Sequence, residues 1–270
     1  MLLSRVASLS IPPRVGDTPS LRKIEMTTWI VGDIHGCADE FDQLLQRLGA
    51  SPSDSIISCG DLFHRGPDPA GVMDLMTDCN AQFILGNHER TVLKRIALDP
   101  QEADGSDRPS LRVHFPTVVA SDLDGDGHEP CHIPVDRRRE FLVFLQTHEG
   151  YFLRSDHVDG AASVHDARQW AVVHAGVLPD LALEDHSPYD LTRTTRLKLP
   201  DEPWWYERYE GDDLLLYGHT SDKLPRIHRS GSRMNSLCLD TACVYGGSLT
   251  AYSPDLDELV SVQARKSYAA

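Results

Sequence analysis

The stretch Trp29-Ile-Val-Gly-Asp33-Ile-His35-Gly36 joins a short apolar run to two side chains that commonly bind metals. Residues 29–31 predict a buried strand that stops at Gly32. Asp33 and His35 follow two residues apart, and in extended backbone this spacing directs both side chains to the same side. A carboxylate oxygen and an imidazole nitrogen that converge suit a divalent transition metal. Taken alone, an ordinary loop explains the stretch better, so the rest of the chain decides.

The first hundred residues repeat one unit three times: a short strand, a polar loop that begins with glycine, and a helix. The predicted strands are residues 29–31, 55–59 and 82–85. The predicted helices are residues 38–48, which end at Gly49, and segments marked by apolar residues at 72–76 and 92–96. Such alternation predicts a mostly parallel sheet, in which ligands bind beyond the carboxyl ends of the strands. We therefore expect the three polar loops at one edge of the sheet.

The second half of the chain supplies two more strand ends of the same kind. After a helix predicted at 137–147, the strand predicted at 170–173 runs directly into His174. The strand predicted at 214–217 runs into Gly218 and then His219. Each of these strands thus delivers one imidazole. The tail is expected to form three antiparallel strands within residues 236–251 and 258–262.

Collected, the strand ends present carboxylates, an amide oxygen, imidazoles and one arginine. These residues are Asp33, His35, Asp61, Arg65, Asn87, His88, His174 and His219. The set suits two metals such as manganese, iron or zinc rather than calcium. A metal pair about 3.5–4 Å apart clamps both oxygens of an in-line phosphoryl displacement, and it lowers the pKa of a bridging water so that hydroxide forms near neutral pH. The constellation therefore points to phosphoester hydrolysis.

Five motifs in order carry a resemblance to a known family. They are Gly32-Asp-Ile-His-Gly36, Gly60-Asp-Leu-Phe-His-Arg-Gly66, Gly86-Asn-His-Glu89, Val173-His-Ala-Gly176 and Gly218-His-Thr220. With these motifs the chain resembles the calcineurin-like metallophosphoesterases over roughly residues 28–252, specifically their phosphoprotein-phosphatase branch, in the manner of bacterial serine/threonine phosphatases and symmetrical dinucleoside tetraphosphatases. The resemblance implies an α/β fold, a four-layer α/β/β/α sandwich with mixed sheets.

The resemblance also implies a metal-binding role for six residues. Asp33 and His35 would hold the first metal, and Asp61 would bridge both metals. Asn87, His174 and His219 would hold the second metal. The cofactors expected are two divalent ions, manganese first, with iron or zinc as alternatives.

Four further residues are candidates for the chemistry itself. By the resemblance, His88 would be the general acid that protonates the leaving oxygen, and Arg65 would bind phosphate oxygens bidentately. A second phosphate-binding arginine is expected between the last two histidine motifs, with Arg196 as first choice and Arg193 as second. The alternative for either is a solvated surface arginine.

His64 departs from the protein-phosphatase pattern, which has Asp immediately before the phosphate-binding arginine. A neutral imidazole stabilises a protonated His88 less well than a carboxylate would. Branches that cleave dinucleoside polyphosphates also lack that Asp, and the segment 239–250 resembles theirs and that of small bacterial phosphatases. His64 thus leaves the substrate open without affecting the metal ligands.

Three functions follow. The first, which we favour at this point, is an enzyme: a metal-dependent phosphatase that hydrolyses phosphomonoesters, including phosphoserine/threonine proteins, by metal-activated hydroxide. The second is a symmetrical dinucleoside polyphosphate hydrolase. The third is a degenerate protein that binds phosphorylated ligands without turnover, an idea that His64 favours and the intact metal ligands oppose. The partner in each case is a phosphorylated molecule: a phosphoprotein, a small phosphomonoester or a dinucleoside polyphosphate.

Composition limits the setting of this chemistry. The formal charge of −15 over 270 residues argues against a nucleic-acid polymer as partner, and no apolar run is long enough for a membrane span. Six cysteines without a Cys-x-x-Cys pair are typical of reduced thiols in a cytoplasmic protein. Cys37 and Cys59, beside the motifs, are expected to be packing groups rather than nucleophiles. The oligomeric state stays open.

The domain organisation expected is one metallophosphoesterase domain over residues 26–266. Residues 1–25 predict a disordered extension rather than a signal peptide, and residues 99–136 an insertion or cap over the site. Within that insertion, residues 122–127 match the opening of a calcium loop, but Ile133 stands where a bidentate Glu belongs, so we favour an acidic surface turn. Trp204, Trp205 and Tyr206 are expected to form a hydrophobic patch rather than a base-stacking site.

Overall fold

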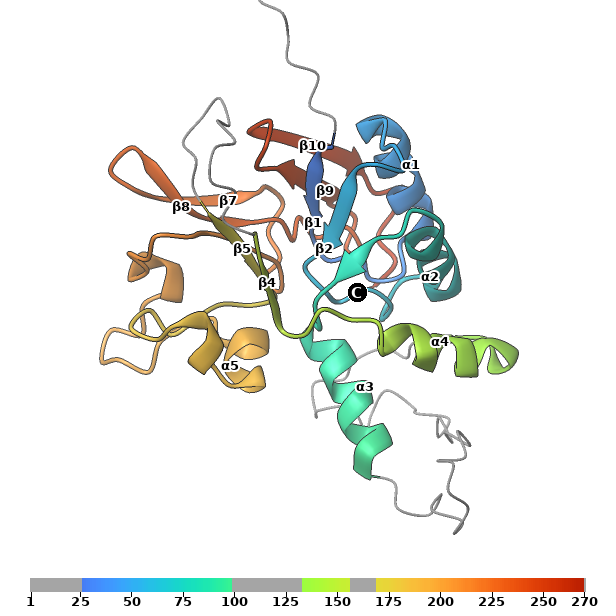
Figure 1. Ribbon diagram of the computed structural model, residues 1–270, viewed down its shortest axis with the longest axis horizontal. Helices are drawn as coiled ribbons and strands as arrows, with labels where there is room; N and C mark the ends of the chain where they lie inside the picture. Colours follow the sequence, from blue (N-terminus) through green and yellow to red (C-terminus); the bar gives the residue numbers. More distant parts are fainter. Residues whose placement is uncertain (1–25, 99–132, 156–168, 270) are drawn as a thin grey trace, which may run out of the picture.

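The computed structural model describes residues 26–98, 133–155 and 169–269. The expected N-terminal extension, the acidic loop at 122–127 and most of the expected cap lie outside these residues. Two five-stranded sheets lie at the centre of the molecule, with helices on their outer faces (Figure 1).

The first sheet contains the three strands of the repeated unit. Its order is β10-β9-β1-β2-β3. The strands are β1 (Thr28–Val31), β2 (Ser55–Ser58), β3 (Gln82–Phe83), β9 (Ser248–Ser253) and β10 (Glu258–Gln263). β1, β2 and β3 are parallel, with Trp29 opposite Ile56, whereas β9 pairs antiparallel with both β1 and β10. The predicted parallel core of this sheet is confirmed, and two antiparallel strands extend it.

The second sheet has the order β4-β5-β6-β8-β7. Its strands are β4 (Phe152–Arg154), β5 (Trp170–Val173), β6 (Leu214–Tyr217), β7 (Arg226–Ser230) and β8 (Arg233–Cys238). β5 and β6 have the predicted limits and are parallel to each other. β4 and β7, which the sequence did not predict, pair antiparallel at the two edges.

The prediction of three antiparallel strands in the tail is wrong for the first of them. β8 lies in the second sheet and pairs parallel with β6, so that only β9 and β10 form the expected antiparallel pair. The hairpin strand β7 reverses the chain after β6, and β8 therefore returns in the direction of β6. Because β7 (Arg-Ile-His-Arg-Ser) is largely polar and exposed, it carries little strand signal and the reversal was missed.

Most of the helices lie on the outer faces of the sheets, and the one that begins at Asn87 extends away from both sheets (Figure 1). They are α1 (Ala38–Leu48), α2 (Pro69–Asp78), α3 (Asn87–Leu98), α4 (Arg138–Leu145) and α5 (Pro188–Arg193), with short 3-10 turns at Val135–Arg137, Leu183–Asp185 and Trp205–Glu207. α1 has the predicted limits and ends at Gly49, whose φ is 61°. α2 begins where the Asp68 carboxylate accepts from the Gly71 amide (2.8 Å). Within the described residues, every helix is too short or too polar to cross a bilayer.

Side chains along β1 point alternately to the two faces of the first sheet and so contribute to two apolar layers. Trp29 and Val31 pack with Phe41 of α1 in the cluster between the first sheet and its helices. Ile30 points to the opposite face and packs with Leu216 of β6 between the two sheets. A third cluster, around Trp205, lies on the other face of the second sheet. These three apolar layers separate four layers of secondary structure, and the α/β/β/α sandwich is confirmed.

Of the three aromatic residues at 204–206, two belong to the core and one lies partly at the surface. Trp205 is 1% exposed, its Nε1 donates to the Ala175 carbonyl (3.1 Å), and its ring meets the Tyr217 ring edge-on at 4.9 Å. Tyr206 is also buried. Trp204 is only half-buried and stacks against the guanidinium of Arg196 at 4.3 Å.

We expect Trp205→Ala to lower the free energy of unfolding by about 3–5 kcal/mol, because it opens a cavity under the second sheet and removes a buried hydrogen bond. Trp204→Ala, the matched control one residue earlier, loses mainly stacking against arginine and should cost about 1 kcal/mol. Urea denaturation followed by circular dichroism measures both. Equal losses in the two variants would contradict this division.

Candidate active site

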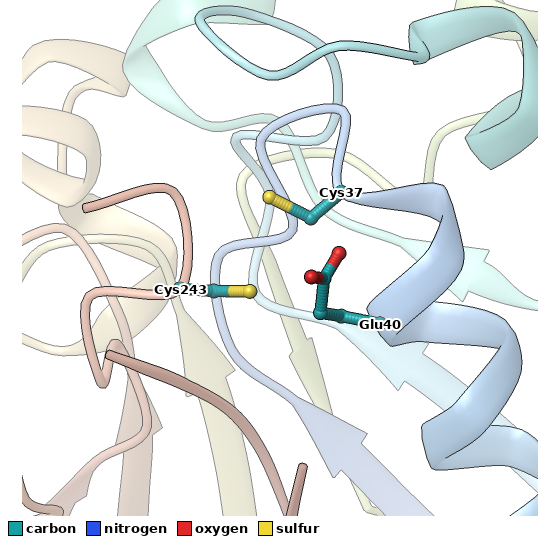
Figure 2. Close-up of side chains that lie close together, drawn as sticks. All are labelled: Cys37, Glu40 and Cys243. Atoms are coloured by element: carbon teal, nitrogen blue, oxygen red, sulfur yellow. The ribbon is translucent and has the colours of Figure 1, made fainter. Parts of the chain in front are cut away.

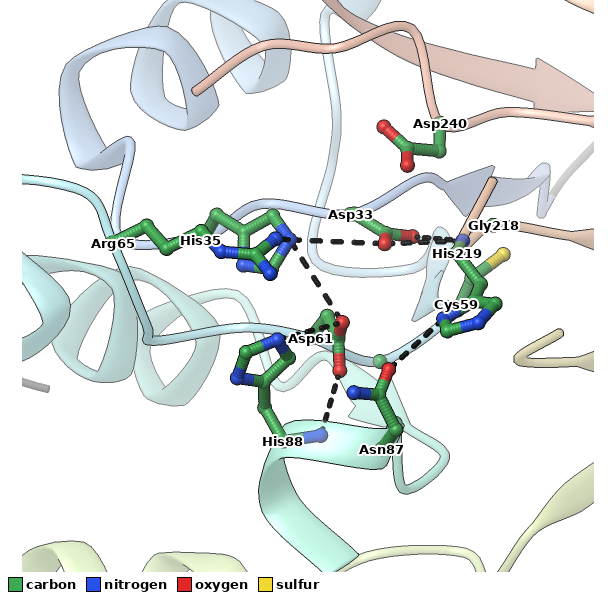
Figure 3. A network of polar contacts seen from close by, with 12 residues as sticks. Asp33, His35, Cys59, Asp61, Arg65, Asn87, His88, Gly218, His219 and Asp240 are labelled. Atoms are coloured by element: carbon green, nitrogen blue, oxygen red, sulfur yellow. Dashed lines mark hydrogen bonds and ion pairs between the residues drawn. The ribbon is translucent and has the colours of Figure 1, made fainter. Parts of the chain in front are cut away.

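The polar loops that follow five strands meet at one place, as Figure 3 shows. Asp33 and His35 follow β1, and Asp61 follows β2. Asn87 and His88 begin α3, just beyond β3. The second sheet contributes two histidines. His174 directly follows β5, and His219 follows β6 with Gly218 between them. The convergence predicted from the strand ends is confirmed, and both sheets contribute to it.

Asp33, His35 and Asp61 form one group that could hold a metal ion. The Nε2 atom of His35 lies 3.9 Å from an oxygen of Asp33 and 3.8 Å from an oxygen of Asp61. All three side chains are buried. Burial lowers the pKa of His35 to about 3, so the imidazole is neutral, which is the form that binds metals.

Asp61, Asn87, His174 and His219 form a second group around the same carboxylate. The Nε2 atom of His174 lies 3.4 Å from Asp61 and 2.9 Å from the Asn87 side-chain oxygen. The Nδ1 atom of His219 lies 2.9 Å from that same oxygen. Donor atoms about 3–4 Å apart suit a cation bound at about 2.0–2.2 Å from each. Asp61 thus belongs to both groups.

The orientation of His174 is fixed by a partner outside the group. Its Nδ1 donates to the Cys59 carbonyl (2.9 Å), so that Nε2 faces the oxygens of Asp61 and Asn87. Burial lowers the pKa of His174, but the Asp61 carboxylate outweighs burial and raises it to about 10. A positive charge is therefore strongly favoured between these oxygens, and a metal cation would supply it.

Several carboxylates share this buried region. Burial and the nearby Asp240 raise the pKa of Asp33 well above its usual value, and burial also raises the pKa of Asp240 to about 6. For Asp61 burial acts in the same direction, but His174 and His88 outweigh it and hold the pKa well below its usual value. The raised pKa values show that ionised carboxylates are unfavourable here unless a cation compensates them. Divalent cations fit both the donors and the charge of this region.

Four of the predicted site residues have left-handed backbone. They are His35 (φ 48°), Asp61 (φ 53°), Arg65 (φ 75°) and His219 (φ 68°). Such a conformation costs about 1–2 kcal/mol for a residue other than glycine. Backbone hydrogen bonds between loops hold it, including His35 N–H to the Asp61 carbonyl (2.8 Å). Strain concentrated on these residues indicates a functional site.

His88, His64 and Arg65 border the two groups. The Nε2 atom of His88 lies 3.7 Å from Asp61, and burial lowers the pKa of His88 well below its usual value. The His64 ring lies 4.6 Å from the His88 ring, so the residue that departs from the protein-phosphatase pattern is next to the expected general acid. Arg65 donates to Nε2 of His35 (3.3 Å) and its guanidinium lies 5.7 Å from the centre of the Tyr245 ring.

The two candidate phosphate arginines lie in different surroundings. Arg196 donates to the Glu202 carbonyl (2.7 Å) and stacks on Trp204. Arg193, the last residue of α5, lies close enough to His219 for its charge to add to burial in lowering the pKa of that histidine to about 3. Of the two arginines, Arg193 is thus the one whose charge acts on a predicted metal ligand. Spacing alone could not separate two arginines three residues apart.

Glu89 and Asp240 belong to the site, although no role was predicted for either from the sequence. The Glu89 carboxylate accepts from the backbone amides of Asp61 (2.8 Å), Leu62 (2.9 Å) and Gly86 (3.1 Å). It therefore fixes the loop that carries Asp61. Its place inside the Gly86-Asn-His-Glu89 motif was the available signal. Asp240, at the end of β8, acts on Asp33 through its charge and lies beside it in Figure 3.

Comparison with known proteins agrees with the fold. The profile of the calcineurin-like phosphoesterase family matches residues 26–239. The chain belongs to this family. It is therefore a metal-dependent hydrolase of phosphoesters, and the expected metal dependence and hydrolase class are confirmed.

Two relatives are named as dinucleoside tetraphosphatases. The chain is 27% identical to bis(5'-nucleosyl)-tetraphosphatase PrpE [asymmetrical] of Bacillus velezensis, with 89% of this chain and 94% of the relative covered. It is 33% identical to the symmetrical bis(5'-nucleosyl)-tetraphosphatase of Acidovorax sp. (strain JS42), but over only 61% of this chain and 49% of that relative.

Solved structures share the fold. The crystal structure of a provisionally assigned diadenosine tetraphosphatase superposes with a TM-score of 0.64 at 23% identity, over 90% of this chain and 96% of that one. A metallophosphoesterase from Sphaerobacter thermophilus gives a TM-score of 0.50 at 16% identity, over 89% of each chain.

We expect Gly218→Ala to weaken metal binding roughly 10- to 100-fold. A Cβ at this position would collide with the Asp33 carboxylate, which also accepts from the His219 amide (3.1 Å). Gly231→Ala is the control: its φ is also positive (61°), but nothing lies within 4 Å of the added carbon. It should lose about 1 kcal/mol of stability and keep its metal affinity. Calorimetric titration with Mn²⁺ compares them, and equal affinities would contradict the role given to Gly218.

Proposed function

We propose that the protein is a dinuclear metal-dependent phosphoesterase whose substrate is a dinucleoside polyphosphate, with dinucleoside tetraphosphates expected first. The observation that carries the dinuclear site is the position of Asp61, whose carboxylate lies within 3.8 Å of His35 on one side and of His174 on the other. Near-complete coverage of relatives named as dinucleoside tetraphosphatases supports the substrate class.

In this proposal Asp33, His35 and Asp61 hold one cation. Asp61, Asn87, His174 and His219 hold the other. We expect manganese, with iron or zinc as alternatives. When bound, the two cations neutralise phosphate charge and make water a stronger acid and nucleophile.

The other residues bind phosphate and prepare the leaving group. Arg65 lies beside His35 and is half-buried. Its planar guanidinium carries several N–H donors, so it is suited to bind two phosphate oxygens at once. Arg193 adds charge next to His219. The Nε2 atom of His88 contacts the same Asp61 oxygen as His35 does, and His88 would give a proton to the leaving oxygen (Figure 3).

His64 favours a phosphoanhydride over an alkyl phosphoester. The neighbour that faces His88 is an imidazole, and Asp61, the carboxylate near it, is bound to the metals in this proposal. Burial lowers the pKa of His88 well below its usual value, so little of this histidine is protonated near neutral pH. A nucleotide phosphate leaves easily because its own conjugate acid has a pKa of about 6, whereas a serine alkoxide needs a proton as it leaves. A general acid that is rarely protonated is adequate for the first reaction and poor for the second.

Phosphomonoesters, including phosphoserine/threonine proteins, are the second candidate. The motif from Gly60 to Gly66 keeps the bridging aspartate and the phosphate arginine of protein phosphatases, and only His64 differs. The same metal groups and Arg65 would serve this reaction. The two substrates differ in how much the leaving group needs a proton from His88.

Product analysis with the manganese-loaded protein tests the proposal. We expect diadenosine tetraphosphate to be hydrolysed at least tenfold faster than an aryl phosphate or a phosphoserine peptide at equal concentration. Ion-exchange chromatography then distinguishes ATP plus AMP, the asymmetrical products, from two molecules of ADP. Asp61→Asn should abolish turnover, because the carboxylate shared by both metals is lost. Preference for the phosphopeptide would establish the second candidate instead.

Arg193→Ala and Arg196→Ala separate the two arginines. Loss of a charge-assisted hydrogen bond to phosphate costs about 1.5–3 kcal/mol, so Arg193→Ala should lower kcat/KM roughly 10- to 100-fold. Arg196→Ala should change kcat/KM less than about twofold, because the Arg196 guanidinium is engaged by Glu202 and Trp204. Steady-state kinetics on the preferred substrate measures both. The reverse order would restore Arg196 as the phosphate ligand.

A further inference from the structure

A third buried group of side chains that can bind a metal lies beside the loop that follows β1, apart from the two catalytic groups (Figure 2). Cys37 immediately precedes α1, Glu40 is in the first turn of α1, and Cys243 is in the loop between β8 and β9. The two sulfur atoms and a Glu40 oxygen all lie within 4.8 Å of one another. Cys37 and Glu40 are 0% exposed and Cys243 is 2% exposed. None of the three has a part in the reaction proposed above.

Glu40 has one carboxylate oxygen that is satisfied and one that is not. Its Oε1 accepts from the Arg265 backbone amide (2.9 Å) and from the Tyr268 hydroxyl (2.8 Å). Its Oε2 is buried and has no hydrogen-bond partner among the described residues. Figure 2 shows the carboxylate directed toward the space beside the two sulfur atoms. A buried carboxylate oxygen without a partner is unfavourable, so this arrangement favours a bound cation.

We propose that Cys37, Glu40 and Cys243 form a third metal site, which holds a structural cation of the zinc class. Two thiolates and a carboxylate are ligands that zinc prefers, whereas magnesium, calcium and manganese favour oxygen. Binding releases the two thiol protons to solvent and leaves one tetrahedral position for water. The site differs from the catalytic groups, whose donors are nitrogen and oxygen alone. The proposal does not depend on the substrate.

A cation at this site would tie together segments that support the catalytic groups. Cys37 follows His35 by two residues, and its Sγ lies 3.7 Å from the His35 carbonyl oxygen. Cys243 lies in the loop that begins at Asp240, whose charge acts on Asp33. Through Glu40 the site also connects to the C-terminal segment at Arg265. The cation would therefore hold the loop after β1 against the loop between β8 and β9.

Cobalt(II) titration of the purified, reduced full-length protein tests the site without relying on activity. Thiolate–cobalt bonds give a strong charge-transfer absorption that nitrogen and oxygen ligands do not give. We expect this band to saturate at one equivalent per chain and to disappear when one equivalent of zinc is added. Wild type should also melt at a higher temperature with zinc than with a chelator.

The variants identify the ligands. Cys37→Ser and Cys243→Ser should lose the charge-transfer band. Glu40→Gln keeps an oxygen for Arg265 and Tyr268 but replaces the unpartnered oxygen, so it should fold and bind cobalt at least tenfold more weakly. Cys79→Ser, at the end of α2, and Cys131→Ser, outside the described residues, should keep the band.

Two outcomes would overturn the proposal. The first is the absence of a charge-transfer band in the reduced wild type, or its survival in Cys243→Ser. The second is a mass 2 Da below the reduced chain in freshly purified protein, removed by a reductant, which would show that Cys37 and Cys243 form a disulfide instead. Neither outcome affects the phosphoesterase assay, which depends on Asp61, so the two proposals fail separately.

Discussion

Negative charge buried at the ends of the strands is the constraint on which the rest of this structure depends. Asp33, Asp61, Glu89 and Asp240 are all at most 5% exposed. A buried carboxylate is costly unless hydrogen bonds or cations compensate it. Three backbone amides compensate Glu89 in part, but burial and Asp61 still raise its pKa to about 7. Asp61 lies near three imidazoles. Bound cations would compensate the charge of the remaining carboxylates, Asp33 and Asp240. The site is therefore a charge arrangement that is complete only with cations.

The sandwich is a means of producing that arrangement. Parallel strands bring their carboxyl ends to one edge, and the first sheet alone assembles Asp33, Asp61 and Asn87 there. Packing a second sheet against it through Ile30 and Leu216 brings the ends of β5 and β6 to the same place. The loops then turn through left-handed conformations that ordinary residues rarely adopt. The strain is tolerated because loops from different strands bond to each other.

Features set by neighbouring residues in the chain were predicted from the sequence, whereas features set by contacts between distant segments were not. The limits of α1, β5 and β6 were predicted because apolar periodicity and a terminal glycine or histidine are local signals. The convergence of the metal ligands was predicted because strand ends share an edge in any parallel sheet. β8 was misplaced because the direction of a buried strand depends on the polar hairpin strand before it, β7.

The functional residues show the same division. Glu89 was given no role because its place in a motif does not show that its carboxylate accepts the backbone amides of Asp61 and Leu62. Arg196 was preferred to Arg193 because their surroundings depend on tertiary contacts, with Trp204 in one case and His219 in the other. Cys37 was expected to be a packing group, and its burial agrees, but only the folded chain brings it together with Cys243 and Glu40.

The loop after β1 connects two kinds of site. Within eight residues it presents Asp33 and His35 to one group, and Cys37 and Glu40 to another. Hard and borderline ligands lie at the strand end, whereas both thiols lie beside α1, away from the catalytic metals. Had a thiol replaced His35, the first group would bind soft cations tightly and exchange them slowly. If the catalytic groups hold metals as proposed, a histidine rather than a thiol at position 35 favours cations that exchange phosphate and water readily. The order of ligand types along this loop is therefore as much a determinant of function as their identity.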